Sequence, residues 1–595
     1  MLHIDEKFKD NSPVKTVENI QSMLRKHGFD VEEKWFETGI EHCHSVTVTI
    51  AGTKLSAHGK GVSRELARAS GHAELMERLQ SGYRGAGGLA FTDMRQMTRE
   101  ELLQENRPYF ERMAQFLNRT ENVNFTAEDL AECSLGFGAV QACKTVPFFN
   151  AETGEKAYIP YQLLRSLYGT NGLAAGNSTA EAIVQGFSEI VERYCQRYFL
   201  EGKLTPPDVP EDYLAQFKTA YSVIEQVRAA GYMVIIKDCS MGDGYPVVAS
   251  AIVNRKERSC RIMFGASPVF EIALERSLTE AFQGCAIKAM PFVKGFYVGK
   301  KRSADDIESA FTRGHANYPL EFFAEKASYD FKPFEDRSNL TNLDLVAYIL
   351  RYLKKKDRTL LIRDLSHLGF HTYRLLVPGM SELHTYSFAG DPSYYRLNMQ
   401  IKNVRSDLRK ANTDELNAYK KTYCMQPTLV GDVPKFSEMT KIPLQLEPQQ
   451  DRFLTLMSLA YAHWETGDRQ QAYECLKTAQ PYANITLREY VACLSQMVEM
   501  LVKGYSHEEA ARLMSRFYDI RLLVTAQVNC ANDNPFANFL ISCNRECKDC
   551  RYANACAYPV NQSVTDRVNA AVAVFDNDAA FENLRNCIEI AKEKN

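Results

Sequence analysis

Residues 174–193 read Ala-Ala-Gly-Asn-Ser-Thr-Ala-Glu-Ala-Ile-Val-Gln-Gly-Phe-Ser-Glu-Ile-Val-Glu-Arg. In a helix, which turns by about 100° per residue, this stretch has two distinct faces. The polar face carries Glu181, Gln185, Glu189 and Glu192, and the opposite face carries Ile183, Phe187, Ile190 and Tyr194. The pattern predicts a helix with one face in a hydrophobic core. The glutamates on the other face repel one another unless cations neutralise them.

The start of this helix is suited to an anion. Asn177 or Ser178 can act as the N-cap, and a turn at Gly176 leaves backbone N–H groups exposed beside the helix start. Such N–H groups bind phosphate well, because the helix dipole adds a partial positive charge.

Two further segments place acids with an arginine on one helix face. In the first, Ser70-Gly-His-Ala-Glu74-Leu-Met-Glu77-Arg78 follows Gly59-Lys60-Gly61; in the second, Arg276, Glu280 and Gln283 share one side of a helix. Any one segment alone favours the solvated face of an amphipathic helix, where each Glu/Arg pair contributes only about 0.2 to 0.5 kcal/mol. Three together indicate a site for hard cations such as magnesium, which prefer carboxylate and phosphate oxygens.

Other patterns surround these helices. Helical spacing over 14–27 predicts a helix, and strands are predicted over 44–50, 232–238, 246–253 and 372–377. Beyond about residue 410 the β pattern fades, and 452–525 is helical throughout. We therefore expect a mixed α/β domain followed by an all-α domain, with boundaries as follows: an N-terminal α/β segment over 1–55, a core over 56–410, a linker over 411–450 and a helical domain over 451–595.

One part of the helical region resembles a tetratricopeptide helix pair. It runs from Leu459 to Ala479, with its turn at Gly467-Asp468. Only one clear copy is present. Since a single unit cannot bury its own apolar face, it is expected to pack on neighbouring helices or on another subunit.

Composition excludes several classes of protein. With 71 basic and 74 acidic residues the net charge is -3, so no long-range field favours nucleic acid or an anionic membrane. No apolar run approaches the length of a membrane span, and the charged N-terminus lacks the features of a secretory signal. The 16 cysteines are mostly scattered, which disfavours a disulfide framework in so long a chain. We expect a cytoplasmic protein that binds neither nucleic acid nor membrane.

Four cysteines do form a cluster. Cys543, Cys547, Cys550 and Cys556 lie within 14 residues, among polar neighbours that are poor core material. The spacing resembles those that hold iron–sulfur clusters or structural zinc, with Cys543 or the distant Cys530 as the fourth ligand. Free thiols are the alternative.

The three acid-bearing segments in this order resemble the YcaO family. Gly-Lys-Gly precedes the first, Gly176-Asn-Ser precedes the second, and the third contains Ala-x6-Glu-x2-Gln. Further similarity lies at Phe264-Gly-Ala266, at Asp364-Leu-Ser-His-Leu-Gly369 and from Arg374 to Ser381. That family binds ATP on carboxylate helices, and no Gly-x4-Gly-Lys-Ser/Thr phosphate loop occurs here.

The resemblance implies a set of site residues. Magnesium ligands or their supports would be Glu74, Glu77, Glu181, Glu189, Glu192 and Glu280. Nucleotide contacts would be Lys9, Thr16, Ser70, Glu74, Arg78, Asn177, Glu181, Gln185, Arg193, Arg276, Glu280, Gln283 and Arg374. A serine is usual in the family where Thr16 stands, and either hydroxyl can donate. The residues closest to the chemistry would be Glu74, Glu77, Glu189, Glu192 and Arg193.

The implied reaction is activation of a peptide backbone amide by transfer of the ATP γ-phosphoryl group to its oxygen. Magnesium and arginine neutralise the charge that develops on the phosphoryl oxygens. The chain ends Ile590-Ala-Lys-Glu-Lys-Asn595. Azoline formers that modify peptides typically end in a proline-rich tail, so a peptide-cyclodehydratase role is disfavoured.

The resemblance implies instead an accessory factor in β-methylthiolation of a small-subunit ribosomal protein, beside a radical-SAM methylthiotransferase. It also implies a homodimer through the C-terminal helices. Two alternatives stay open. The chain is a catalytically idle scaffold for the methylthiotransferase, or it forms azolines or thioamides in peptide natural products.

Overall fold

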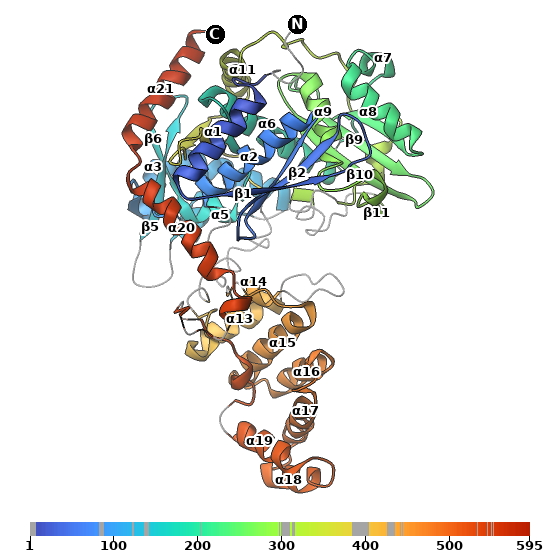
Figure 1. Cartoon of the computed structure of the whole chain (residues 1–595). Helices are drawn as coiled ribbons and strands as arrows, with labels where there is room; N and C mark the ends of the chain where they lie inside the picture. Colours follow the sequence, from blue (N-terminus) through green and yellow to red (C-terminus); the bar gives the residue numbers. More distant parts are fainter. Residues whose placement is uncertain are drawn as a thin grey trace. The chain divides into compact units, whose positions relative to one another are not determined.

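The structure is a computed structural model of the chain, and two compact units make it up (Figure 1). Unit 1 comprises residues 1–135, 140–390 and 563–595, and unit 2 comprises residues 136–139 and 391–562. The structure describes residues 8–82, 89–121, 124–135, 142–202, 204–294, 296, 298, 310–311, 316–383, 401, 404–424, 435–440, 442, 444–531, 534–543, 546–548, 550 and 552–594.

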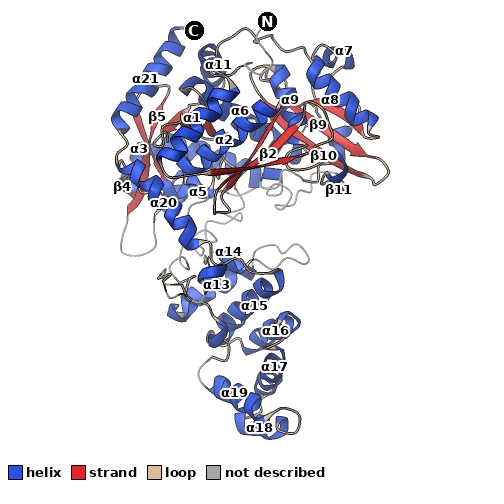
Figure 2. Cartoon of the chain, viewed as in Figure 1, coloured by secondary structure: helices blue, strands red, loops and turns tan. Residues whose placement is uncertain are grey.

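Unit 1 mixes helices and strands, as the sequence predicts (Figure 2). Its strands are β1 (Val31–Phe36), β2 (His44–Ile50), β3 (Ser56–Gly61), β4 (Arg95–Thr98), β5 (Ala142–Asn150), β6 (Lys156–Pro160), β7 (Leu173–Ala175), β8 (Met233–Asp238), β9 (Val247–Asn254), β10 (Ser259–Ala266), β11 (Val293–Lys294), β12 (Leu361–Asp364) and β13 (Thr372–Leu376). Its helices are α1 (Pro13–Lys26), α2 (Arg64–Ser81), α3 (Arg99–Glu121), α4 (Ala127–Ser134), α5 (Tyr161–Ser166), α6 (Thr179–Leu200), α7 (Glu211–Leu214), α8 (Lys218–Ala229), α9 (Phe270–Glu280), α11 (Asn342–Lys355) and α21 (Asn577–Glu593), with α20 (Tyr558–Ala573) from residue 563 onward. The predicted helix and strands lie within a residue or so of α1, β2, β8, β9 and β13.

The strands of unit 1 form three sheets. One has the order β1-β2-β3, the second β11-β10-β9-β8, and the third β4-β5-β12-β13-β7 with β6 paired to β5. Every pairing between the described strands is antiparallel, for example Val48 opposite Ala57 in β2 and β3. The three sheets supply the surfaces on which the acid-bearing helices α2, α6 and α9 pack.

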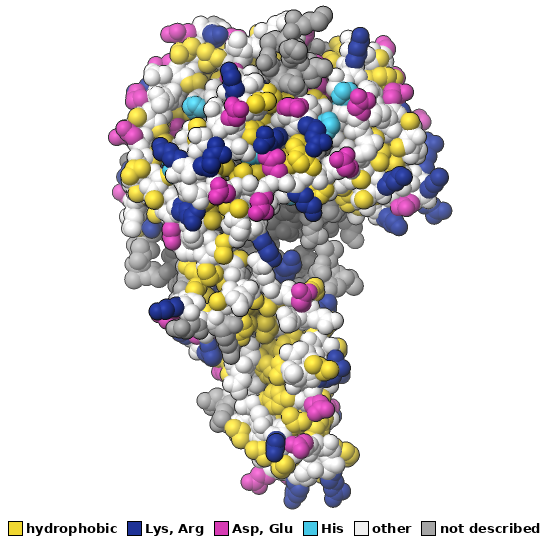
Figure 3. Space-filling model, in the orientation of Figure 1, with side chains coloured by type: hydrophobic (Ala, Val, Ile, Leu, Met, Phe, Trp, Pro, Cys, Tyr) yellow, Lys and Arg dark blue, Asp and Glu magenta, His cyan; other side chains and the backbone are white. Residues whose placement is uncertain are grey.

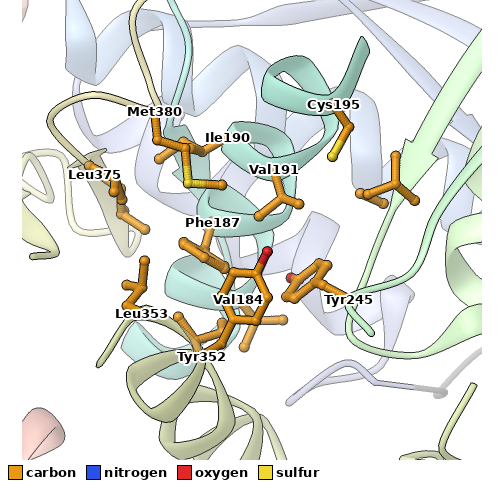
Figure 4. Close-up of a cluster of buried hydrophobic side chains, with 14 of the residues drawn as sticks. Val184, Phe187, Ile190, Val191, Cys195, Tyr245, Tyr352, Leu353, Leu375 and Met380 are labelled. Carbon is orange, nitrogen blue, oxygen red and sulfur yellow. The ribbon is translucent and has the colours of Figure 1, made fainter. Parts of the chain in front are cut away.

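Helix α6 is the centre of the largest hydrophobic core. Its apolar face is buried, and the Phe187 ring meets Tyr245 and Tyr352 edge-on at centroid distances of 5.6 and 6.0 Å. Figure 4 shows these rings together, with Ile190 and Val191 on the same helix and Leu353 near Phe187. Burial of this face leaves the acid face of α6 directed away from the core.

Glycines bring strands unusually close to two of these helices. A Cβ on Gly59 of β3 would lie 2.0 Å from the Ala67 carbonyl oxygen of α2, and one on Gly265 of β10 would lie 2.3 Å from the Ala273 oxygen of α9. Such distances are below any real contact, so only glycine permits this packing. The Gly-Lys-Gly and Phe-Gly-Ala motifs therefore set how closely the helices approach their sheets.

The end of the chain returns to unit 1. Leu584, Ile588 and Ala591 of α21 are buried in the same core as α6, and Val564 and Val568 of α20 pack with residues of α2. The Lys594 ammonium lies 2.6 Å from the Asp344 carboxylate at the start of α11. The sequence-based division placed 451–595 in one helical domain, whereas the contacts assign 563–595 to unit 1.

The described part of unit 2 is predominantly helical. It contains α13 (Thr413–Cys424), α14 (Phe436–Thr440), α15 (Pro448–Glu465), α16 (Arg469–Ala479), α17 (Arg488–Val502), α18 (His507–Met514), α19 (Ile520–Ala531) and the first residues of α20. The predicted helix pair is α15 and α16, joined at Gly467, whose φ of +84° ends the first helix, and Asp468, which caps the second.

Two surface properties accord with the composition. No helix in the described part of the chain combines the length and the apolar character that a membrane span requires. On the face drawn in Figure 3, acidic and basic side chains of unit 1 are interspersed, in keeping with the net charge near zero.

Candidate functional site

One large cavity in unit 1 collects the acid-bearing helices. Its volume is about 650 Å³, and its walls come from α1, α2, α6, α9, α11 and strands β3 and β10. Of the residues expected from the sequence, it is lined by Lys9, Thr16, Ser70, Glu74, Glu77, Arg78, Asn177, Glu181, Gln185, Glu189, Glu192, Arg193, Arg276, Glu280 and Gln283. Residues up to 274 positions apart in the chain (Lys9 to Gln283) therefore share one chamber.

Helix α2 presents two carboxylates held by one arginine. The Arg78 guanidinium lies 3.1 Å from Glu74 Oε1 and 3.0 Å from Glu77 Oε1. Burial raises the pKa of Glu77 to about 8; Arg78 opposes the shift, and the nearby Glu189 and Glu74 add to it. Glu77 thus carries a negative charge only at a considerable electrostatic cost, which a bound cation would relieve.

Helix α6 faces α9 across the cavity. Arg276 donates to Gln185 Oε1 at 2.6 Å, and the same guanidinium lies 4.0 Å from Glu192. Glu189 Oε1 is 3.3 Å from Arg193 Nε on the same helix. Burial raises the pKa of Glu192, against the opposing effects of Arg276, Arg193 and Lys60.

Residues 9–16, which form the N-terminal strip, contact the start of α6 at the edge of the chamber. Lys9 Nζ lies 3.1 Å from Glu181 Oε1, and the Thr16 hydroxyl donates to Asn177 Oδ1 at 2.8 Å. Asn177 Nδ2 in turn donates to Glu181 Oε2 at 3.1 Å. Burial alone would raise the pKa of Glu181, but Lys9, the Asp10 N–H and Asn177 together lower it. Glu181 is therefore ionised, and it anchors the strip.

Two residues in or next to this chamber, Lys60 in its wall and Asp10 beside it, were missed by the sequence reasoning. Lys60 forms an ion pair with Glu280, and burial together with Arg276 lowers the pKa of Lys60 to about 8 although Glu192, Glu74 and Glu189 raise it. Its place in the Gly-Lys-Gly motif was the available signal. Asp10 accepts hydrogen bonds from Ser178, the N-cap of α6, and from Asn342 Nδ2 at 2.9 Å. No sequence pattern distinguished it.

Arg374 is the exception among the expected nucleotide contacts. It does not line the cavity; its guanidinium donates to the carbonyl oxygens of Leu164 and Gly169, each at 2.8 Å. Successive side chains of a strand point to opposite faces, and this position of β13 faces the interior of the fold. The structure thus gives Arg374 a place that differs from the expected nucleotide contact.

The acids of the chamber fit a magnesium-bound triphosphate. Glu189 Oε1 is buried and accepts no hydrogen bond from any described residue. Among the described residues no three His, Cys, Asp or Glu side chains are arranged to enclose an ion, and the glutamates are instead paired with basic groups. Magnesium is commonly held by one or two carboxylates together with water and substrate phosphates, so no all-protein cage is needed.

The clustered cysteines lie elsewhere. Cys543, Cys547, Cys550 and Cys556 belong to unit 2, and none of them lines this cavity.

Comparison with known proteins identifies relatives of this chain. The chain is 29% identical over 391 residues to the ribosomal protein S12 methylthiotransferase accessory factor YcaO of Escherichia coli K12, a match covering 63% of this chain and 66% of that protein. An uncharacterised protein of Haemophilus influenzae is 25% identical over 406 residues, covering 66% of this chain and 68% of the relative. The chain thus spans about two thirds of the length of these two relatives.

Solved structures show similarity as well. YcaO from Methanopyrus kandleri, bound with AMPPCP and Mg²⁺, matches at 20% identity and a TM-score of 0.40, covering 64% of this chain and 94% of that one. A heterocyclase in complex with substrate and cofactor matches at 20% identity and a TM-score of 0.46, covering 62% and 53%.

A family model described as YcaO cyclodehydratase, ATP- and Mg²⁺-binding, matches residues 58–381. These residues include the acid-bearing helices α2, α6 and α9 and the strands on which they pack. The chain belongs to the YcaO family of ATP- and magnesium-dependent, backbone-activating proteins.

Proposed function

We propose that this chain is an enzyme that uses magnesium-bound ATP to phosphorylate a backbone amide oxygen, in the service of β-methylthiolation of a small-subunit ribosomal protein. The observation that carries the proposal is the convergence of α2, α6 and α9 on one cavity of about 650 Å³. Burial of their carboxylates costs free energy, and a bound magnesium ion would offset this cost by neutralising their charge.

The residues around the cavity divide into three groups by what they can do. Glu77, Glu189 and Glu192 are half-buried acids that can hold magnesium directly or through water. Arg193 and Arg276 lie beside them and would neutralise phosphoryl oxygens if the carboxylates held magnesium. Asn177 and the backbone N–H groups at the N-terminus of α6 can donate hydrogen bonds to a phosphate. Lys9 forms an ion pair with Glu181 beside them.

Bound Mg-ATP would supply the phosphoryl group that turns the amide oxygen into a leaving group. The chain's own task is to bind the triphosphate, to orient it and to exclude water. No protein nucleophile is needed for this chemistry, because the attacking group belongs to the substrate or to a second reactant.

The choice of substrate rests on the E. coli relative, whose name gives its role as an accessory factor for ribosomal protein S12 methylthiotransferase. We therefore propose a small-subunit ribosomal protein as substrate, a radical-SAM methylthiotransferase as partner and a homodimer as the working form. The runner-up is a scaffold that binds Mg-ATP without turnover.

The test measures Mg-ATP affinity and phosphate release by the purified full chain, with and without the ribosomal protein. We expect Glu189→Gln to lower magnesium-dependent ATP affinity at least tenfold, and Glu65→Gln, an exposed change on α2, to leave it unaltered. Phosphate release that rises with the ribosomal protein supports ATP turnover on that substrate. Tight binding without any release favours the scaffold, and the absence of Mg-ATP binding by the wild type overturns both.

A further inference from the structure

We propose that Cys543, Cys547, Cys550 and Cys556 of unit 2 together bind a metal centre through their thiolates, either a zinc ion or an iron–sulfur cluster. This site is separate from the ATP cavity, and its existence does not depend on the function proposed above.

Backbone contacts place Cys543 and Cys556 beside one apolar cluster. Cys556 pairs with Leu444 in an isolated β-bridge. The residue after Leu444, Gln445, donates its N–H to the Ala555 oxygen at 2.7 Å. At the other end, the Cys543 N–H donates to the Ser406 oxygen at 3.1 Å. Cys543 and Cys556 both pack against one apolar cluster, formed by Phe436, Ile442, Leu444 and Ile541. The first and last cysteines of the motif are therefore held beside the same patch.

Two backbone hydrogen bonds connect the described residues in the middle of the segment. The Cys550 N–H donates to the Cys547 oxygen at 3.3 Å, and the Ala553 N–H donates to the Cys550 oxygen at 3.0 Å. A Cys-x2-Cys turn is the unit from which structural zinc and iron–sulfur sites are commonly built.

The Cys556 sulfur has a backbone hydrogen-bond donor beside it. The Tyr558 N–H donates to Cys556 Sγ at 3.4 Å. An amide hydrogen bond to sulfur stabilises a thiolate and tunes metal–thiolate centres, whereas neighbouring thiolates repel one another until a cation neutralises them.

The alternatives fit the segment less well. All four thiols are half-buried and none is in a disulfide, whereas most of the other described cysteines are fully buried in apolar cores. Cys530, the other candidate for the fourth ligand, is one of these: it lies on α19 and is buried in a different apolar cluster, whereas Cys543 packs against the same cluster as Cys556. Cys543 is therefore the fourth ligand in this proposal.

Binding requires the side chains to turn toward one another. Among the described residues no three candidate ligands stand at metal-binding positions. A cysteine side chain changes the position of its sulfur by rotation about a single bond, χ1. Metal binding would then cross-link the segments around Ser406, Leu444 and Cys556 and stabilise this part of unit 2.

The test is the metal content of the full chain purified without oxygen. We expect either about one zinc per chain, or several iron atoms with matching acid-labile sulfide and visible absorption. The double change Cys547→Ser and Cys550→Ser should abolish this content, whereas Cys530→Ala and the unit 1 change Cys285→Ser should keep it.

A second measurement covers the case in which the double variant misfolds. Mild chelation of wild-type protein should remove the metal and lower the melting temperature, and readdition should restore both. Wild-type protein that holds neither metal in stoichiometric amount, even after reconstitution with zinc or with iron and sulfide, overturns the proposal. So does a double variant with the metal content of the wild type.

Discussion

Lys60 is surrounded by acids in the cavity. It pairs with Glu280, and Glu192, Glu74 and Glu189 act on it as well. Removal of its charge leaves Glu280 without its partner and removes a donor that can reach phosphate oxygens. We expect Lys60→Met to raise the KM for Mg-ATP by about tenfold or more, a change of roughly 1.4 kcal/mol or above. Lys60→Arg should recover part of the loss, and an unchanged KM for Lys60→Met would exclude this role.

His367 makes the stability of unit 1 depend on pH. Burial, with Arg363 and His27 nearby, lowers the pKa of its imidazole from 6.5 to about 3. Between these values the unfolded chain binds the proton and the folded chain does not, so stability falls as the pH drops from about 6.5 toward 3. The loss attributable to this group is on the order of 1.4 kcal/mol per pH unit within the window.

Urea unfolding at pH 7, 6 and 5 measures this effect. We expect His367→Gln to show a shallower loss of stability with acid than the wild type, with a change at pH 7 that reflects packing against Phe91 and Phe575 only. Parallel pH profiles for the two proteins would contradict the assignment.

The close contact between Gly59 of β3 and helix α2 fixes the position of the helix that carries Glu74 and Glu77. An added methyl group at Gly59 would meet backbone atoms of Ala67 and Gly71, which cannot move aside without shifting α2. We expect Gly59→Ala to destabilise the fold by about 1 to 3 kcal/mol or more and to weaken Mg-ATP binding, because Glu74 and Glu77 move with the helix.

Gly52 provides the matched control. It has a φ of +72° but open space around it, so Gly52→Ala should cost only about 1 kcal/mol and leave nucleotide affinity as it is. Thermal unfolding and Mg-ATP titration of both variants separate the two effects. If Gly59→Ala and Gly52→Ala lose the same affinity for Mg-ATP, Gly59 does not act by positioning α2.

Across the whole molecule, the last helix completes the core that the first half of the chain begins. Ile588 of α21 is fully buried beside α6, whereas Ile590 on the same helix is 47% exposed. We expect Ile588→Ala to destabilise unit 1 by about 2 to 5 kcal/mol and Ile590→Ala by less than about 1. Mg-ATP should raise the melting temperature of wild type and Ile590→Ala alike. Similar melting temperatures for the two variants would contradict this account.

Local periodicity could be predicted from the sequence because it depends only on neighbouring residues. The acid stripe of α6, the strand over 44–50 and the turn at Gly467 all follow from side chains within a few positions of one another. The family resemblance then allowed the helices to be assigned to one site, although nothing in their spacing states that they meet.

Tertiary packing alone decided the rest. Arg374 faces backbone carbonyls, Asp10 bridges α6 and α11, and α21 returns to the core of α6 after unit 2. Each of these depends on contacts between residues more than 150 positions apart. Such contacts form when buried surface outweighs the entropy of closing a long loop, a balance that no local pattern records.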